Sequence, residues 1–207
     1  MMQRRSFLRM LSAGTAAAAL SSSLACAAPA PAVTTISTFY DTLIEVMKQA
    51  KTLGFKGRYE KLDPAMRRAY NLPLMTRLSI GPDWQNLSPE QQSALTAAFS
   101  DFSISTYASR FNGYSGERFE VNPEPVSTAG GVIVSTKLIE SDGNVVELNY
   151  LLREGEGGWQ IIDVFLKGTV SELATRRSEF AAVLRRDGAG ALLQLIQQRT
   201  ADLKKGV

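Results

Sequence analysis

Asp163 is the one acidic side chain inside the otherwise apolar stretch 159–166. A carboxylate in such a place can act as a general base, because an apolar environment raises its pKa towards the working range. Tyrosine hydroxyls such as those of Tyr40, Tyr107 and Tyr150 can complete such a site by stabilising a developing oxyanion. The alternative is a structural acid that accepts hydrogen bonds from a nearby arginine, tyrosine or backbone N–H. We favour the structural role, because no second acid is convincingly placed for catalysis in the same group of strands.

The composition excludes several classes of catalysis. The chain has no histidine and a single cysteine, Cys26. Serine–histidine and cysteine–histidine mechanisms are therefore excluded, as is zinc or haem binding through His or Cys. Cys26 lies in a segment that we expect to be removed, so no disulfide can form within a mature monomer. We expect no cofactor, no metal and no catalytic residue.

Residues 1–27 have the pattern of a cleaved export signal of the twin-arginine type. Arg4 and Arg5 precede an alanine-rich apolar run at 11–20, and Ala25-Cys26-Ala27 fits a cleavage site. The apolar run is too short to span a bilayer. The cysteine lacks the leucine that a lipid-attachment motif has three residues earlier. We therefore expect a soluble, exported protein without a lipid anchor.

Removing this segment also removes the basic character of the chain. The full sequence has 23 Lys+Arg and 20 Asp+Glu, and three of the arginines but none of the acids fall within the first 27 residues. The mature chain thus carries 20 residues of each sign and no net charge. This balance gives no support for nucleic-acid binding.

The first half of the mature chain predicts helices. We expect a flexible linker at 28–35 and a single domain at 36–207, with a first helix from Ile36 to about residue 54. Asp63-Pro64 starts or restarts a helix, and 72–80 is a short apolar segment around a proline. Ser88-Pro89-Glu90-Gln91 is a strong helix start, because serine can cap the helix, proline suits its first position and glutamine its third.

Strands follow, and then helices again. The strand candidates lie at 118–126, 131–140, 145–153 and 159–166, and Ser141-Asp142-Gly143-Asn144 is a hairpin turn. Strict alternation would place Trp159, Ile161, Asp163 and Phe165 on one face of the last strand. Ser171 caps a helix to 184, and glycines at 188 and 190 separate it from a final helix. The pattern predicts an α+β fold, an antiparallel sheet of about four to five strands with helices packed over it.

The motifs in 159–180 follow one another as W-x-I-x-D-V, G-x-V-S and R-R-S-x-F. These motifs resemble those of the MlaC-like (toluene-tolerance) family of periplasmic lipid carriers, and the similarity extends over residues 39–196. Residues 107–119 and 171–180 are most similar to its hopanoid-associated HpnM branch. The resemblance implies a curved, NTF2-like cone that encloses an apolar cavity. It also implies a periplasmic protein that carries hopanoid or phospholipid between the outer and inner membranes.

The partners implied by the resemblance are an inner-membrane MCE/ABC-type complex and an outer-membrane lipoprotein complex. We expect no binding of nucleic acid, and a monomer. Two alternatives stay open. One is an NTF2-like periplasmic enzyme with Asp163 as general base. The other is a non-enzymatic interaction module with a solid core, which would bind through an exposed patch or edge strand.

Sequence alone does not separate a residue that lines a cavity from one that fills a core, because both are apolar and face inward. Arg58 and Arg77 each interrupt a largely apolar stretch, so we expect them at the pocket mouth or at a lipid headgroup. For the lipid pocket we expect the inward-facing set Leu43, Met47, Leu74, Met75, Leu78, Trp84, Phe99, Phe102, Val132, Val134, Leu148, Tyr150 and Ile161.

Overall fold

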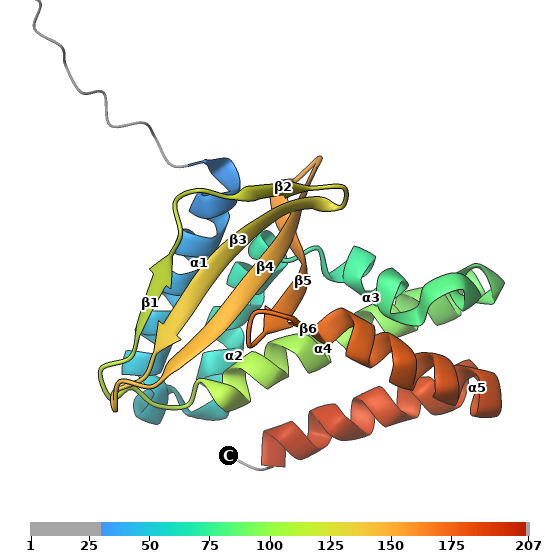
Figure 1. Ribbon diagram of the computed structural model, residues 1–207. Coiled ribbons are helices and arrows are strands. Elements are labelled where there is room, and N and C mark those ends of the chain that lie inside the picture. Colours follow the sequence, from blue (N-terminus) through green and yellow to red (C-terminus); the bar gives the residue numbers. More distant parts are fainter. Residues whose placement is uncertain (1–29, 206–207) are drawn as a thin grey trace, which may run out of the picture.

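The structure is a computed structural model that describes residues 30–205, so the export signal expected at 1–27 lies outside the described residues. The helices α1 and α2 lie behind the sheet in Figure 1, and α3, α4 and α5 extend beyond one end of it. The elements in chain order are α1 (Pro31–Lys48), α2 (Ala50–Ala69), α3 (Leu72–Ile80), the short 3-10 helix η1 (Gly81–Asn86), α4 (Pro89–Arg110), β1 (Arg118–Val121), β2 (Val126–Thr128), β3 (Gly131–Ile139), β4 (Val145–Gly155), β5 (Gly158–Leu166), β6 (Val170–Ser171) and α5 (Glu172–Lys205).

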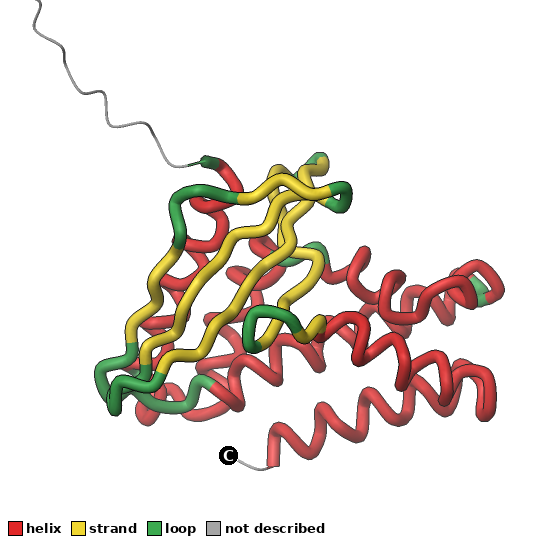
Figure 2. The backbone as a smooth tube through the Cα atoms, in the orientation of Figure 1, coloured by secondary structure: helices red, strands yellow, loops and turns green. Residues whose placement is uncertain are grey.

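The strands form one open, antiparallel sheet with the order β1-β3-β4-β5-β6, and β2 also pairs with β3. Figure 2 shows the long strands side by side, with helices behind one face. The hairpin between β3 and β4 turns at Gly143, as predicted, and the Gly143 N–H donates to Glu140 O over 2.9 Å. The predicted α+β architecture is therefore confirmed.

The inner face of the sheet follows the predicted alternation in β3 and β4. Val134 pairs with Tyr150 and Thr136 pairs with Leu148, and these four side chains are buried. Hydrophobic residues of α1 to α5 pack on this face in one continuous core.

The predicted alternation in β5 is wrong in its second half, because the strand contains a β-bulge. Leu152 pairs with Ile161 but Tyr150 pairs with Val164, so β5 has one extra residue between the two pairs. The bulge moves Asp163 to the face opposite Ile161 and brings Val164 inward. Regular alternation cannot reveal such an insertion, because it depends on how β5 pairs with β4.

Two helix boundaries differ from the sequence-based expectation. Residues 31–35, expected in a flexible linker, form the first turn of α1, where Ala32 and Val33 are buried and Thr35 Oγ1 donates to Trp159 O over 2.9 Å. Proline suits the first position of a helix, so Pro31 starts α1 rather than delaying it. Pro64 does not start a helix but lies inside α2.

The helix breaks occur at glycines. Gly54 in α2 and Gly188 in α5 have φ values of 59° and 81°, and each interrupts an otherwise continuous helix. These backbone conformations are accessible mainly to glycine. The predicted capping box of α4 is present, since Ser88 Oγ accepts from Gln91 N over 3.3 Å and Gln91 Oε1 accepts from Ser88 N over 3.0 Å. In the part of the chain that the structure describes, no helix is long and apolar enough to cross a membrane.

Candidate functional site

A cavity of about 110 Å³ lies between the inner face of the sheet and the helices α2 to α5. Its walls are mainly apolar and aromatic, with a few polar groups, which is the usual composition of a small-molecule site. The lining residues are Met66, Tyr70, Leu72, Met75, Phe99, Ser103, Thr106, Tyr107, Arg110, Phe111, Leu148, Tyr150, Val164, Leu166, Glu172 and Arg176.

The sheet contributes four neighbouring side chains to the cavity wall. Leu148 pairs with Leu166 and Tyr150 with Val164, and all four line the cavity. Directly paired residues in adjacent strands project from the same face. The bulge in β5 is what aligns Val164 and Leu166 with this face. Local strand geometry therefore shapes the wall.

Tyrosine hydroxyls gather at this wall. Tyr40 Oη is 2.9 Å from Tyr150 Oη and 2.7 Å from Thr136 Oγ1, and the hydroxyl oxygens of Tyr70 and Tyr107 are 2.5 Å apart. Burial raises the pKa of Tyr70 and Tyr150 well above the usual value and also raises the pKa of Tyr107. These phenols therefore stay protonated at neutral pH and can donate hydrogen bonds.

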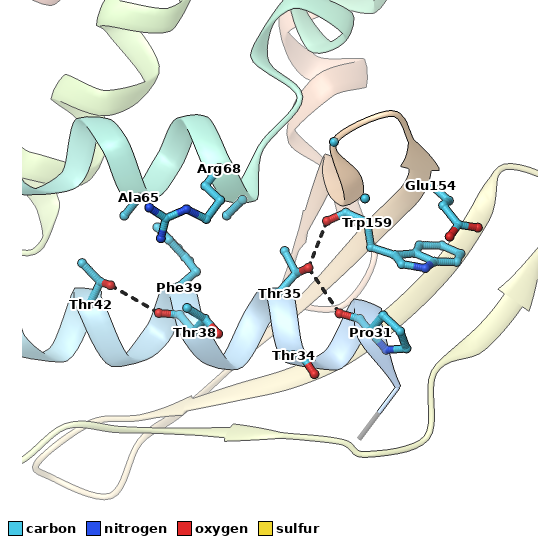
Figure 3. Close-up of a pocket in the computed structure, with 13 residues that line it drawn as sticks. Pro31, Thr34, Thr35, Thr38, Phe39, Thr42, Ala65, Arg68, Glu154 and Trp159 are labelled. Atoms are coloured by element: carbon cyan, nitrogen blue, oxygen red, sulfur yellow. Dashed lines mark hydrogen bonds between the residues drawn. The ribbon is translucent and has the colours of Figure 1, made fainter. Parts of the chain in front are cut away.

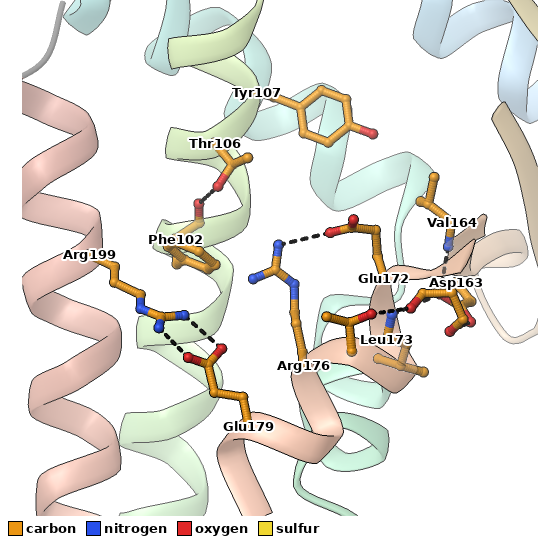
Figure 4. Close-up of polar contacts among 12 residues, drawn as sticks. Phe102, Thr106, Tyr107, Asp163, Val164, Glu172, Leu173, Arg176, Glu179 and Arg199 are labelled. Atoms are coloured by element: carbon orange, nitrogen blue, oxygen red, sulfur yellow. Dashed lines mark hydrogen bonds and ion pairs between the residues drawn. The ribbon is translucent and has the colours of Figure 1, made fainter. Parts of the chain in front are cut away.

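Charged side chains form the polar part of the cavity lining. Arg176 lies 3.4 Å from Glu172 and stacks over the Phe102 ring, with its guanidinium carbon 4.7 Å from the ring centroid (Figure 4). Burial lowers the pKa of Arg176, and the Glu172 carboxylate opposes that shift. Arg110 is exposed and lines the same cavity. Two cations and one anion therefore line this side of the cavity.

Four of the residues expected in the pocket line this cavity, namely Met75, Phe99, Leu148 and Tyr150. The others lie elsewhere. Leu43, Met47, Val134 and Ile161 are buried in the core, Phe102 packs against Arg176, Val132 and Leu74 are half-buried, and Leu78 and Trp84 line a separate surface groove.

The two arginines expected at the pocket mouth do not line the cavity. Arg58 is 2% exposed, and it donates to Ala108 O over 2.7 Å and to Ala50 O over 3.0 Å. It thereby binds a carbonyl near the end of α4, where a cation is favourable, and a second carbonyl at the start of α2. Arg77 is exposed and lines the groove beside Trp84.

The cavity arginines that sequence reasoning missed are Arg110 and Arg176. Each lies in a segment used for the family resemblance, but neither interrupts an apolar run, so hydropathy gave no signal. Leu72 and Leu166 were likewise missed as pocket residues. Their position follows from the placement of α3 and from the bulge, neither of which is visible in apolar spacing.

Asp163 has a structural role in this fold. Its Oδ1 accepts from Val164 N over 2.8 Å and from Leu173 N over 3.1 Å, and its Oδ2 accepts from Ser171 Oγ over 2.5 Å (Figure 4). Ser171 Oγ in turn accepts from Ala174 N over 2.9 Å, as the predicted helix cap. The carboxylate therefore joins β5 to the start of α5, and it does not line the cavity.

A second, more open groove of about 400 Å³ lies between α1, α2 and the turn from β4 to β5. Its wall includes Thr35, Thr38, Arg68, Glu154 and Trp159, and Figure 3 shows these side chains along the groove. In the described residues 30–205, no group of three or more Cys, His, Asp or Glu side chains is placed to hold a metal ion.

The architecture of helices over an open antiparallel sheet agrees with the comparison to known proteins. The family model described as MlaC protein matches residues 37–198. The chain belongs to the MlaC family. A solved structure of a phospholipid-binding protein from Ralstonia solanacearum, in complex with a phospholipid, superimposes with a TM-score of 0.74 at 23% identity. The match covers 84% of this chain and 99% of that one, and it shows that the two share a fold.

Proposed function

We propose that this MlaC-family chain is a lipid carrier and that its cavity holds the apolar part of the lipid. The observation that carries the proposal is the apolar cavity between the sheet and α2 to α5. Its methionines, Met66 and Met75, suit a site that accepts irregular hydrocarbon shapes, because methionine side chains adapt easily. The related Ralstonia solanacearum protein, described as phospholipid-binding, supports a lipid as ligand.

The charged lining favours an anionic headgroup. Arg110 and Arg176 line the cavity with a single acid, Glu172. Guanidinium groups bind phosphate oxygens with two parallel hydrogen bonds, so these arginines are suited to a phosphate. We propose that the headgroup lies beside Arg110, which is exposed, while the hydrocarbon enters between α3 and the sheet.

The size of the cavity sets a condition on loading. Pockets for small organic ligands usually measure ~300–1,000 Å³, whereas this cavity measures about 110 Å³. A two-chain lipid therefore requires a wider cavity. Part of the wall facing the sheet is formed by α3, through Leu72 and Met75, and by the start of α5. We propose that these helices move away from the sheet when lipid enters.

Energetics favour transfer by direct contact. Burying a methylene group is worth about 0.8 kcal/mol, so ~30 methylenes contribute on the order of 24 kcal/mol before ordering costs. A lipid held in this way rarely escapes into water. The carrier then needs membrane-bound partners. From the resemblance we propose an MCE/ABC-type complex at the inner membrane, a lipoprotein complex at the outer membrane, a periplasmic location, and hopanoid or phospholipid as cargo.

Mass spectrometry of an organic extract tests this function. The mature protein would be purified from its native periplasm without detergent, so that it keeps any lipid it carries. A stoichiometric hopanoid or phospholipid would support the carrier function and identify the cargo. An extract without lipid, from a protein that also takes up none from vesicles, would contradict it.

A further inference from the structure

The charges that line the cavity do not cancel. Arg110 and Arg176 contribute two positive charges, and Glu172 contributes one negative charge. The lining therefore carries one positive charge in excess. Burial is the main cause of the lowered pKa of Arg176, and the positive charge of Arg110 adds to it. The two cations thus act on the same space.

The Arg176 guanidinium has donors to spare. Among the described residues it makes one hydrogen bond, from Nη2 to Glu172 Oε2 over 3.4 Å (Figure 4). A guanidinium has five N–H donors in one plane. The Phe102 ring lies against one face of that plane, 4.7 Å from the guanidinium carbon, and limits how the group can turn. Arg176 can therefore bind a phosphate with its remaining donors while it stays paired with Glu172.

Glu172 lies where its charge acts on any anion bound to Arg176. Its side chain is 28% exposed and that of Arg176 is 19% exposed, so water screens the pair only in part. A phosphate diester carries one negative charge, which balances the lining. A phosphate monoester carries about two negative charges at neutral or higher pH. Its second charge would find no positive partner and would be repelled by Glu172, which is unfavourable in a partly buried site.

We propose that Glu172 determines which headgroup charge the carrier accepts. With Glu172 in place, the cavity favours a lipid with a single phosphodiester charge, and it disfavours both a phosphomonoester lipid and a lipid without phosphate. This inference rests on the proposed carrier function and adds the residue that selects the headgroup. Arg110 and Arg176 bind the phosphate, and Glu172 limits its charge.

Three lipids with identical chains test the proposal. They are dipalmitoyl phosphatidylglycerol, dipalmitoyl phosphatidic acid and dipalmitoylglycerol, which carry a phosphodiester, a phosphomonoester and no phosphate. The measurement is the dissociation constant of each lipid for the purified mature protein at about pH 8, where the monoester holds close to two charges. We expect phosphatidylglycerol to bind about fivefold more tightly than phosphatidic acid and about tenfold more tightly than dipalmitoylglycerol.

Variants separate the role of the charge from a structural role. Glu172→Gln should shift the ratio of the two phospholipid affinities at least about fivefold towards phosphatidic acid, because the second phosphate charge is no longer repelled. Glu172→Asp keeps the charge and should keep the wild-type preference. Asp187→Asn is the matched control, since it also removes an acid that is paired with an arginine of α5, Arg186, and lies outside the cavity lining. It should leave the ratio unchanged.

Arg110→Gln keeps the test decisive if Glu172→Gln fails to fold. Arg110 is exposed, so its replacement should not disturb the core. It removes the excess positive charge, and the preference for phosphatidylglycerol over dipalmitoylglycerol should fall to less than about threefold.

Two results would overturn the role of Glu172. One is a phospholipid ratio that is the same in the wild type and in a folded Glu172→Gln variant. The other is equal binding of phosphatidylglycerol and dipalmitoylglycerol by the wild type, because the headgroup charge would then not be recognised. If the wild type binds none of the three lipids, the carrier function itself fails. The two failures are therefore distinguishable.

Discussion

Leu148→Trp is the substitution that most directly tests the cavity. Leu148 is 8% exposed, lies at the middle of β4, and lines the cavity beside Leu166. Tryptophan exceeds leucine by roughly the volume of two methylene groups, each worth about 0.8 kcal/mol of burial. Filling this space removes about 1.6 kcal/mol of lipid binding, which corresponds to roughly fifteenfold weaker affinity.

The variant is expected to fold. Overpacking a filled core costs ~1–3 kcal/mol, but here the added atoms enter existing space, so the cost should lie at the lower end. For a domain of this size the melting temperature should then fall by less than about 5 °C. Leu151→Trp is the matched control, because Leu151 lies on the same strand but faces away from the cavity, paired with Asp163.

The assay is lipid occupancy by native mass spectrometry after incubation with phosphatidylglycerol vesicles, together with thermal unfolding. We expect low occupancy for Leu148→Trp and wild-type occupancy for Leu151→Trp. Unchanged loading of a folded Leu148→Trp protein would refute the assignment of this cavity. An equal loss in both variants would show that any tryptophan in β4 disturbs loading, which would also refute it.

Three further predictions concern stability. Asp163→Asn replaces the carboxylate that accepts from Leu173 N and Ser171 Oγ and should lower the free energy of unfolding by about 1–3 kcal/mol in urea titrations, with lipid occupancy unchanged. A loss of lipid binding at unchanged stability would contradict this role. A hydrogen bond from Arg199 lowers the pKa of Glu179 in the folded protein. The pair therefore stabilises the fold fully at pH values above the unfolded-state pKa of about 4.3. This stabilisation is lost as the pH falls through the lower folded-state pKa. Both side chains are more than one third exposed (37% and 38%). Glu179→Gln should therefore lower the free energy of unfolding by only about 0.5 kcal/mol at neutral pH and leave it unchanged in strong acid. A decrease that does not depend on pH would argue against the ion pair. Gly188→Ala should lower the free energy of unfolding by about 1–3 kcal/mol, because Gly188 has φ 81° and ψ 177°, a backbone conformation that alanine adopts only with strain. Gly190→Ala, where the added methyl group meets no atom within 4 Å, should instead stabilise α5 by about 0.5–1 kcal/mol; equal effects of the two substitutions in thermal melts would contradict the break at Gly188.

Local sequence patterns were sufficient for most secondary structure. The capping box at Ser88, the turn at Gly143 and the cap at Ser171 depend on residues within a few positions of one another, so their chemistry can be read directly from the sequence. Burial of alternate residues in β3 and β4 was likewise predictable, because a sheet covered on one face imposes a two-residue period. Family membership also rested on local motifs.

The candidate site was only partly predictable. Leu148 and Tyr150 were identified because they face inward, but Leu43 and Val134 have the same pattern and lie in the solid core. Arg58 was placed at the mouth because it interrupts an apolar stretch, yet it is buried beside Ala50 and Ala108 carbonyls. Whether a side chain in a regular strand faces inward follows from its place in the local sequence. How far that side chain lies from the helices on the opposite side does not.

By itself, the sequence determined which catalytic side chains are absent, where most helices and strands lie, and which side chains of β3 and β4 face inward, because these follow from residue type and short-range periodicity. Only the tertiary structure decided that β5 contains a bulge, that Val164 rather than Asp163 faces the cavity, and that Tyr70 and Tyr107 meet. Those outcomes depend on pairing and packing between segments far apart in the chain. Whether an inward-facing residue fills a core or borders a cavity is decided by the elements that pack opposite it.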